Sequence, residues 1–174
     1  PLQSGSDEIL KAMKRRYNTK LYADRVQKIK SIMPYACIGV DVIVGFPGES
    51  DDHFQQTYNF LDGLDISYLH VFSYSMRNNT EAVLMNNKVP QDIISERSKM
   101  LHRLSIVKKQ NFYKNNIESM KQVLIEDFEE GFLYGHSENY IPVNILGKRN
   151  EVNKIIPVKF IQIEDGAMIG ERQI

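Results

Sequence analysis

The apolar positions in the first two thirds of the chain follow two different periods. Residues 7–16, 20–33 and 51–63 place apolar side chains three or four positions apart, as amphipathic helices do, and a longer window of the same kind comes later. Residues 38–44 and 66–74 are instead short runs rich in β-branched and aromatic residues, and the first reads as a strand covered on both faces. The alternation predicts βα units with a parallel sheet, either open or curled into a barrel.

The helical windows also predict which side chains face the core. Pro34 terminates the second window and Gly63 terminates the third. We expect the following side chains to point inward: Tyr22, Val26, Ile29, Met33, Phe54, Tyr58, Leu61, Ile94, Leu101, Leu104, Val107 and Phe112.

Beyond Glu118 the pattern changes to short segments separated by glycine turns. The five segments are residues 120–126, 132–136, 140–145, 155–163 and 167–171. Five strands in so short a stretch predict a small closed barrel of the OB type. We therefore expect two domains, an α/β domain over residues 1–118 and a β-barrel over residues 119–174.

The stretch from Asp41 to Glu49 joins an apolar strand to the acidic start of a helix through a glycine turn. Gly45 and Gly48 let the backbone turn and approach a ligand without a Cβ in the way, and Ser50 supplies an N-cap oxygen. Ligands of α/β proteins collect at this edge of the sheet. The turn is therefore a candidate ligand site, although an ordinary strand-to-helix turn explains the same glycines equally well.

The charge of the chain limits how it could bind nucleic acid. The chain has 22 Lys and Arg against 22 Asp and Glu. Residues 1–118 hold sixteen basic and thirteen acidic side chains, whereas residues 119–174 hold six and nine. Any contact with nucleic acid must therefore come from local patches.

Other features bear on the compartment. No apolar run approaches the roughly 18 residues that span a bilayer, so we expect no membrane partner. The single cysteine, Cys37, has no disulfide partner, which fits a reducing cytoplasm. The sequence starts at Pro1 without an initiator Met, and we expect a cytoplasmic fragment of a longer protein.

Three motifs occur in the order found in a known enzyme family. They are PLQSGSDEILKAMKRRY, ACIGVDVIVGFPGES and LHVFSYSMRNNTEAVLM. Together they resemble the radical S-adenosylmethionine methylthiotransferases, and residues 121–145 are similar to the C-terminal TRAM domain of that family. The ACIG segment and YLHVFSYS most resemble the branch that methylthiolates threonylcarbamoyladenosine next to the tRNA anticodon.

The resemblance implies the second half of a TIM-like radical barrel followed by a TRAM barrel. It also implies a whole enzyme that uses S-adenosylmethionine and two four-iron four-sulfur clusters. Each cluster needs about three or four thiolates, and this chain has one cysteine. We therefore expect missing N-terminal domains of the same chain to hold the clusters. The fragment alone should be inactive, with no metal and no cofactor bound.

The resemblance also implies which residues would bind S-adenosylmethionine. Those that match the cofactor-binding segments are Gln3, Ser4, Arg15, Arg16, Val44, Gly45 and Phe46. The first two could bond to ribose or to the methionyl group, a guanidinium suits its carboxylate, and the last three would lie against the adenine. Turn capping, a solvated helix end and core packing are the alternative roles of these side chains.

The TRAM resemblance implies contact with the tRNA anticodon arm. Aromatic rings would stack on bases, cations would meet phosphates and an amide would bond to a base edge. The candidates are Lys121, Tyr134, His136, Asn139, Tyr140, Lys148 and Arg149. Plain barrel core and surface are the alternative, because this part of the chain is net acidic.

Three functions are consistent with these motifs. The first is part of a methylthiotransferase acting on threonylcarbamoyladenosine. The second moves the substrate to isopentenyladenosine in tRNA or to a ribosomal protein. The third is a non-catalytic RNA-binding module.

Overall fold

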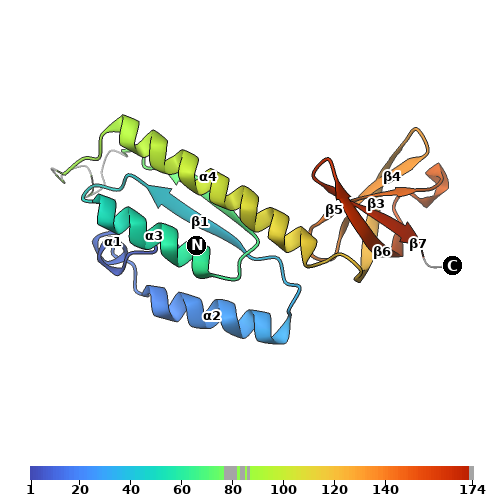
Figure 1. The fold of residues 1–174 in the computed structure, drawn as a ribbon, viewed down its shortest axis with the longest axis horizontal. Helices are drawn as coiled ribbons and strands as arrows, with labels where there is room; N and C mark the ends of the chain where they lie inside the picture. The colour runs from blue at the N-terminus through green and yellow to red at the C-terminus, as the bar shows by residue number, and fades with distance from the viewer. Residues whose placement is uncertain (77–81, 83–84, 86, 173–174) are drawn as a thin grey trace. The chain divides into compact units, whose positions relative to one another are not determined.

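Two compact units, residues 1–109 and 110–174, make up the protein. The structure, a computed structural model, describes residues 1–76, 82, 85 and 87–172. Part of the LHVFSYSMRNNTEAVLM motif therefore lies outside the described residues. The first unit is α/β and the second is built around a β-barrel (Figure 1).

Parallel strands organise the first unit. Strand β1 (Gly39–Val44) pairs in parallel with β2 (Tyr68–Ser73) along its whole length. On the other side of β1, Gln3 forms a parallel bridge with Val42, and its backbone bonds to both Asp41 and Ile43. The expected α/β class with parallel strands is confirmed. Only the face of β1 that carries its valines is fully buried, so the prediction of two covered faces was wrong.

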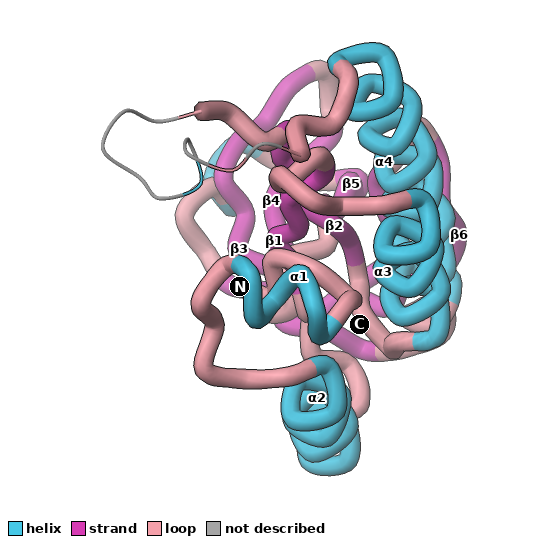
Figure 2. Tube along the Cα trace, turned by 90° about the vertical axis from the view of Figure 1, so that its left-hand side faces the viewer, coloured by secondary structure: helices cyan, strands magenta, loops and turns pink. Residues whose placement is uncertain are grey.

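Four α-helices accompany these strands in the described part of the chain. They are α1 (Asp7–Ala12), α2 (Thr19–Ile32), α3 (Asp51–Gly63) and α4 (Gln91–Lys114). In the end-on view of Figure 2, α3 and α4 run side by side. Among the described residues, no helix is both long and apolar enough to cross a membrane.

The first helix is shorter than its sequence predicts. Lys14 has a left-handed φ of 56°. The amide of Lys14 donates to the carbonyl of Lys11, and that of Arg15 to the carbonyl of Leu10. This pair of bonds is a Schellman ending, which normally uses glycine at the left-handed position. The helix therefore ends at Ala12 and not at Arg16 as the sequence pattern predicts.

The valine face of β1 packs against α3 and α4. Leu61 and Leu101 are fully buried in this core, and Ile94 and Leu104 nearly so. Side-chain bonds fix the register, since the Ser105 hydroxyl accepts from the amide of Leu69 at 2.9 Å and donates to its carbonyl at 3.1 Å.

Three of the side chains expected to point inward are instead exposed: Ile29 by 37%, Met33 by 55% and Val107 by 49%. On α4 the inward face continues from Leu104 to Lys108, whose ammonium donates to the carbonyls of Asp62 and Leu64. Val107 is displaced to the outer side by this register. On α2 only Val26 is buried.

The second unit is a closed five-stranded barrel, as predicted. Its strands are β3 (Met120–Glu129), β4 (Phe132–Ser137), β5 (Pro142–Leu146), β6 (Ile155–Glu164) and β7 (Ala167–Arg172). They close in the order β3, β4, β5, β7, β6, and only the β5–β7 pair is parallel. Bulges in β3 and β6 bend these long strands around the barrel. A short 3-10 helix, η2 (Arg149–Glu151), lies between β5 and β6.

A glycine on β4 allows the barrel strands to approach. A Cβ added to Gly135 would lie 2.0 Å from the carbonyl oxygen of Leu124 on the backbone of β3. We expect Gly135→Ala to lower the free energy of unfolding by about 1–3 kcal/mol, as overpacking does. Urea unfolding followed by circular dichroism measures this change.

Gly63 provides the matched control for this substitution. It is the last residue of α3, and nothing lies within 4 Å of an added Cβ. Gly63→Ala should leave the stability unchanged or raise it slightly, because alanine favours helix. Equal stabilities of the two variants would contradict the close approach at Gly135.

Candidate functional site

A cavity of about 990 Å³ lies at the carboxyl ends of the parallel strands of the first unit. Its wall includes Gln3, Arg15, Ile43, Phe46, Phe72 and Tyr74. Pockets that enclose drug-sized ligands have volumes of about 300–1000 Å³. The cavity is therefore large enough for a nucleoside with a further substituent, and it lies at the edge of the sheet where the sequence predicts a ligand.

Gln3 and Arg15 come together at this cavity. Gln3 has a left-handed φ of 77°, a conformation that is uncommon outside glycine and often marks a functional position. Its side-chain oxygen accepts a hydrogen bond from the Arg15 guanidinium at 3.2 Å. The Schellman ending of α1 places Arg15 for this bond. Arg15 and Arg16 are both exposed, but Arg16 does not line the cavity.

Of the other residues expected to bind the cofactor, some line the cavity and some are buried in the interior of the first unit. Phe46 lines the cavity, and its ring packs edge-on against Tyr74 with centroids 5.4 Å apart. The side chains of Ser4 and Val44 are buried, and the hydroxyl of Ser4 lies 3.2 Å from that of Thr57 on α3. Gly45 has a φ of 79°. The assignment of these residues to a cofactor remains a prediction.

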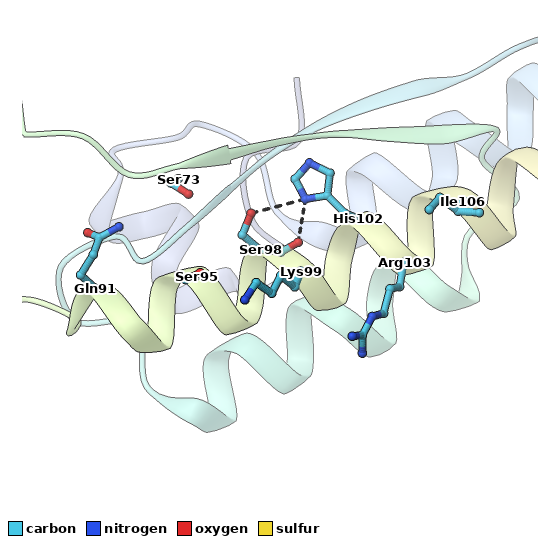
Figure 3. A pocket seen from close by; sticks show the side chains of 8 residues that line it. All are labelled: Ser73, Gln91, Ser95, Ser98, Lys99, His102, Arg103 and Ile106. Atoms are coloured by element: carbon cyan, nitrogen blue, oxygen red, sulfur yellow. Dashed lines mark hydrogen bonds between the residues drawn. The ribbon is translucent and has the colours of Figure 1, made fainter.

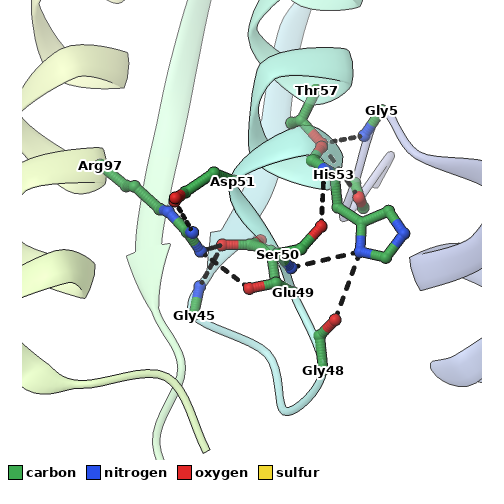
Figure 4. A network of polar contacts seen from close by, with 10 residues as sticks. Gly5, Gly45, Gly48, Glu49, Ser50, Asp51, His53, Thr57 and Arg97 are labelled. Atoms are coloured by element: carbon green, nitrogen blue, oxygen red, sulfur yellow. Dashed lines mark hydrogen bonds and ion pairs between the residues drawn. The ribbon is translucent and has the colours of Figure 1, made fainter. Parts of the chain in front are cut away.

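A buried polar network holds the turn after β1 (Figure 4). The Glu49 carboxylate accepts from the amide of Gly45 at 3.0 Å and from the Arg97 guanidinium at 2.6 Å. Arg97 also donates to the Glu49 carbonyl at 3.1 Å and to Asp51 at 2.6 Å. The side chains of Arg97 and Glu49 are only 6% and 2% exposed. The network therefore ties α4 to the turn that carries Phe46.

Burial raises the pKa of Glu49, and the bonds from Gly45 and Arg97 oppose this rise. Sequence analysis did not identify Arg97 as part of the site. The available signal was its position, because Arg97 falls on the apolar stripe of α4 between Ile94 and Leu101. A cation on such a stripe needs a buried partner.

Tyr74 is a second cavity residue that sequence analysis missed. Its hydroxyl is buried and has no hydrogen-bond partner among the described residues. Such an unpartnered group costs about 1–3 kcal/mol, and a ligand or an ordered water could satisfy it. The cavity thus combines an amide, a guanidinium, aromatic rings and a spare hydroxyl. This donor set fits S-adenosylmethionine, which carries a carboxylate, a ribose and an adenine.

The described residues do not fit an iron-sulfur cluster. They contain no group of three or more His, Cys, Asp or Glu side chains placed to hold a metal ion. Cys37 is half-buried, and burial raises the pKa of its thiol, which disfavours the thiolate that ligates iron.

Two side chains expected to bind RNA are instead engaged within the barrel unit. Lys121 is buried and lies 3.8 Å from the carboxylate of Glu138. Asn139 is also buried, and its amide donates to Asn116 at 3.0 Å.

Other RNA candidates lie on the barrel surface. The Tyr140 side chain is 79% exposed. His136 and Tyr134 lie on the outer face of β4, and the Nδ1 of His136 lies 2.8 Å from the carboxylate of Glu126. In the strand register His136 is opposite the exposed Leu124 of β3. Leu124 in turn lies opposite Ile155, which is 66% exposed. These two apolar residues lie beside the residues that the sequence predicts for RNA binding, and they were not themselves predicted.

Lys148 and Arg149 lie at the start of η2, where hydrogen bonds to Glu151 hold the backbone. The Glu151 carboxylate accepts from the amide of Lys148 at 2.8 Å and from the guanidinium of Arg172 at 2.6 Å. The Arg172 bond, followed by that of Lys148, lowers the pKa of Glu151 to about 2. The Arg149 guanidinium lies over the ring of Phe128, 5.4 Å from its centroid.

Comparison with known proteins first shows a similarity in the N-terminal third of the chain. Residues 1–61 match the radical SAM superfamily, and these residues include β1 and the turn that borders the cavity.

Two groups of relatives are similar over nearly the whole chain. The chain is 36% identical to "Threonylcarbamoyladenosine tRNA methylthiotransferase MtaB" of Bacillus subtilis over 93% of its length, and 42% identical to that of Aquifex aeolicus over 90%. It is 34% identical to "tRNA-2-methylthio-N(6)-dimethylallyladenosine synthase" of Clostridium botulinum over 98%. The resemblance to the C-terminal part of the radical SAM methylthiotransferases is therefore confirmed. The chain spans 37% to 39% of the length of these relatives.

The buried pair predicts how the first unit responds to substitution and to pH. We expect Arg97→Leu to lower the free energy of unfolding by about 3–5 kcal/mol at pH 7, because it leaves the Glu49 carboxylate buried without a cation. Burial already raises the pKa of Glu49, so the loss should shrink as the pH falls and the carboxyl takes up its proton. Urea unfolding at pH 7 and pH 4.5 measures both effects.

The double variant Glu49→Gln with Arg97→Leu is the matched control. It removes both charges, so its stability should depend less on pH than that of Arg97→Leu alone. A loss in Arg97→Leu that is equal at both pH values would contradict the role of the carboxylate.

Proposed function

We propose that this chain supplies part of a tRNA methylthiotransferase of the radical SAM type. Residues 1–118 would be the second half of the radical barrel, and residues 119–174 would be its TRAM-like RNA-binding barrel. The observation that carries the proposal is the cavity at the edge of the parallel strands, with Gln3, Arg15 and Phe46 in its wall. This role would place the protein in the cytoplasm.

In this proposal the wall of the cavity binds S-adenosylmethionine, which supplies the radical chemistry when it is bound together with a cluster. The guanidinium of Arg15, oriented by Gln3, would pair with the cofactor carboxylate. Phe46 would lie against the adenine, and Tyr74 would offer its hydroxyl to the ribose. The clusters would be held by other domains of the same protein, since the described residues do not fit them.

We propose threonylcarbamoyladenosine next to the anticodon as the substrate. The identities of 36% to 42% to relatives that act on this nucleoside support this choice. Isopentenyladenosine is the second candidate, because relatives named for the dimethylallyl nucleoside are 34% to 35% identical over 98% of the chain. Both candidates are modified adenosines in tRNA, as the names of these relatives state.

A chimaera tests the substrate. These 174 residues would replace the corresponding part of Bacillus subtilis MtaB. The chimaera would be expressed in a Bacillus subtilis strain that lacks its own MtaB and its own tRNA-2-methylthio-N(6)-dimethylallyladenosine synthase. We expect mass spectrometry of the tRNA nucleosides to detect methylthiolated threonylcarbamoyladenosine. Methylthiolated isopentenyladenosine alone would favour the second candidate.

Two controls complete the test. Bacillus subtilis MtaB itself, expressed in the same strain, reports the full level of modification. If a chimaera that is soluble and carries its clusters forms neither methylthiolated nucleoside, this result would contradict the proposal that these residues complete the enzyme.

The barrel predicts weak and salt-dependent binding of RNA. With Lys121 buried, phosphate contact within the barrel falls chiefly to Lys148 and Arg149. Each phosphate contact contributes about −0.7 to −0.9 to the slope of log affinity against log salt, so we expect about −1.4 to −1.8 from these two cations. Fluorescence anisotropy with an anticodon-arm hairpin at several salt concentrations measures the slope.

Two variants separate charge from stacking in this assay. Lys148→Ala with Arg149→Ala should lower both the affinity and the slope. Tyr140→Ala should lower the affinity with little change in slope, because stacking releases no counterions. Unchanged binding in the double variant would indicate that this part of the barrel is a structural cap.

A further inference from the structure

A second hollow, of about 490 Å³, lies along α4 in the first unit (Figure 3). Its wall is made of three serines, Gln91, Ile106 and the basic or imidazole side chains of Lys99, His102 and Arg103. No carboxylate is among the described residues that line it. A lining of cations, hydroxyls and an amide suits an anionic ligand with hydroxyl groups, and it does not suit a metal ion.

The two cations of the hollow have no partner among the described residues. Lys99 and Arg103 are four positions apart on α4, so their side chains extend from neighbouring turns of one helix side (Figure 3). Neither forms an ion pair within the described part of the chain. By contrast, the pair at the same spacing on α2, Lys20 and Asp24, is neutralised at 2.8 Å. Two like charges at this spacing repel each other, so an external anion would stabilise the arrangement.

His102 presents a hydrogen-bonding nitrogen at the same place. Its Nδ1 lies 2.8 Å from the carbonyl oxygen of Ser98, so this nitrogen carries a hydrogen and donates it. The other nitrogen, Nε2, has no partner among the described residues and can accept a bond from a hydroxyl. The hydroxyl of Ser98 lies 3.4 Å from Nδ1, on the side of α4 that faces the end of β2 (Figure 3).

The position of the hollow connects it to the cofactor cavity. Ser73, the last residue of β2, lines both. A ligand that places one nucleotide at the carboxyl edge of the sheet would therefore continue along α4. A nucleic acid strand has this form, since its phosphates and sugars repeat on both sides of the reacting base.

We propose that the hollow along α4 binds the sugar-phosphate backbone of the RNA substrate, next to the nucleotide that enters the cavity. Lys99 and Arg103 bind phosphates, and His102 Nε2 accepts a bond from a ribose 2′-hydroxyl, the group that distinguishes RNA from DNA. The inference rests on the proposed function and adds a second RNA contact, separate from the barrel.

Charge-removing variants of the 174-residue chain test this contact. The probe is a labelled hairpin with the sequence of a tRNA anticodon arm, and the readout is its affinity across a series of salt concentrations. Lys99→Gln with Arg103→Gln should weaken binding several-fold and reduce the salt slope by about 1.4 to 1.8, as expected for two phosphate contacts. Lys20→Gln with Lys28→Gln removes the same charge from exposed positions on α2 and should change neither.

A second measurement probes the ribose contact. The wild-type chain should bind the RNA hairpin more tightly than the same hairpin made of DNA, and His102→Ala should reduce this difference. Because His102 is exposed, the substitution should leave the thermal unfolding temperature unchanged, which circular dichroism checks.

The outcomes separate the two proposals. An unchanged salt slope in the α4 variant, together with a reduced slope in Lys148→Ala with Arg149→Ala, would overturn this inference and leave the RNA-binding barrel standing. The same loss in the α2 control as in the α4 variant would show only an effect of net charge and would also overturn the inference. A wild-type chain that does not bind the hairpin at low salt would overturn both.

Discussion

The buried ion pair between Arg97 and Glu49 is the interaction on which the cavity of the first unit depends. Removing two charges from water costs several kcal/mol per ion, and this cost is recovered only when good geometry and further hydrogen bonds satisfy both partners. Here Arg97 donates to two carboxylates and a carbonyl, and Glu49 also accepts from Gly45. The pair therefore fixes the long helix, the glycine turn and the start of α3 as one body, with Phe46 at its edge.

The elements of both units could be predicted because their apolar periods are clear. The five strands of the barrel begin within two residues of the positions expected from the sequence. The end of α1 could not be predicted, because Lys14 takes a left-handed conformation that normally calls for glycine. The exposure of Ile29 and Met33 also could not be predicted, since periodicity shows which side of a helix is apolar but not how much of it other elements cover.

The candidate site was predictable only in part, because motifs show the chemistry of a side chain but not which neighbours pack against it. Motifs identified Gln3, Arg15 and Phe46, because these positions match segments of a known family. They did not reveal Arg97 or Tyr74, which reach the site through packing between elements far apart in the sequence. Lys121 and Asn139 show the opposite case. Their chemistry suits RNA, but neighbours within the barrel unit already engage it.

The parallel contact between β5 and β7 gives the barrel a seam. Only Val143 with Met168 and Asn144 with Ile169 are in register there, whereas each antiparallel pair of the barrel has five or six register pairs. The seam also joins strands that are not consecutive, so the ring cannot close until β6 and β7 have been placed. Closure therefore needs a contact between segments that are not consecutive in the chain, and such non-local contacts slow folding. Local opening of the native barrel would begin at this seam, where the fewest backbone bonds must break.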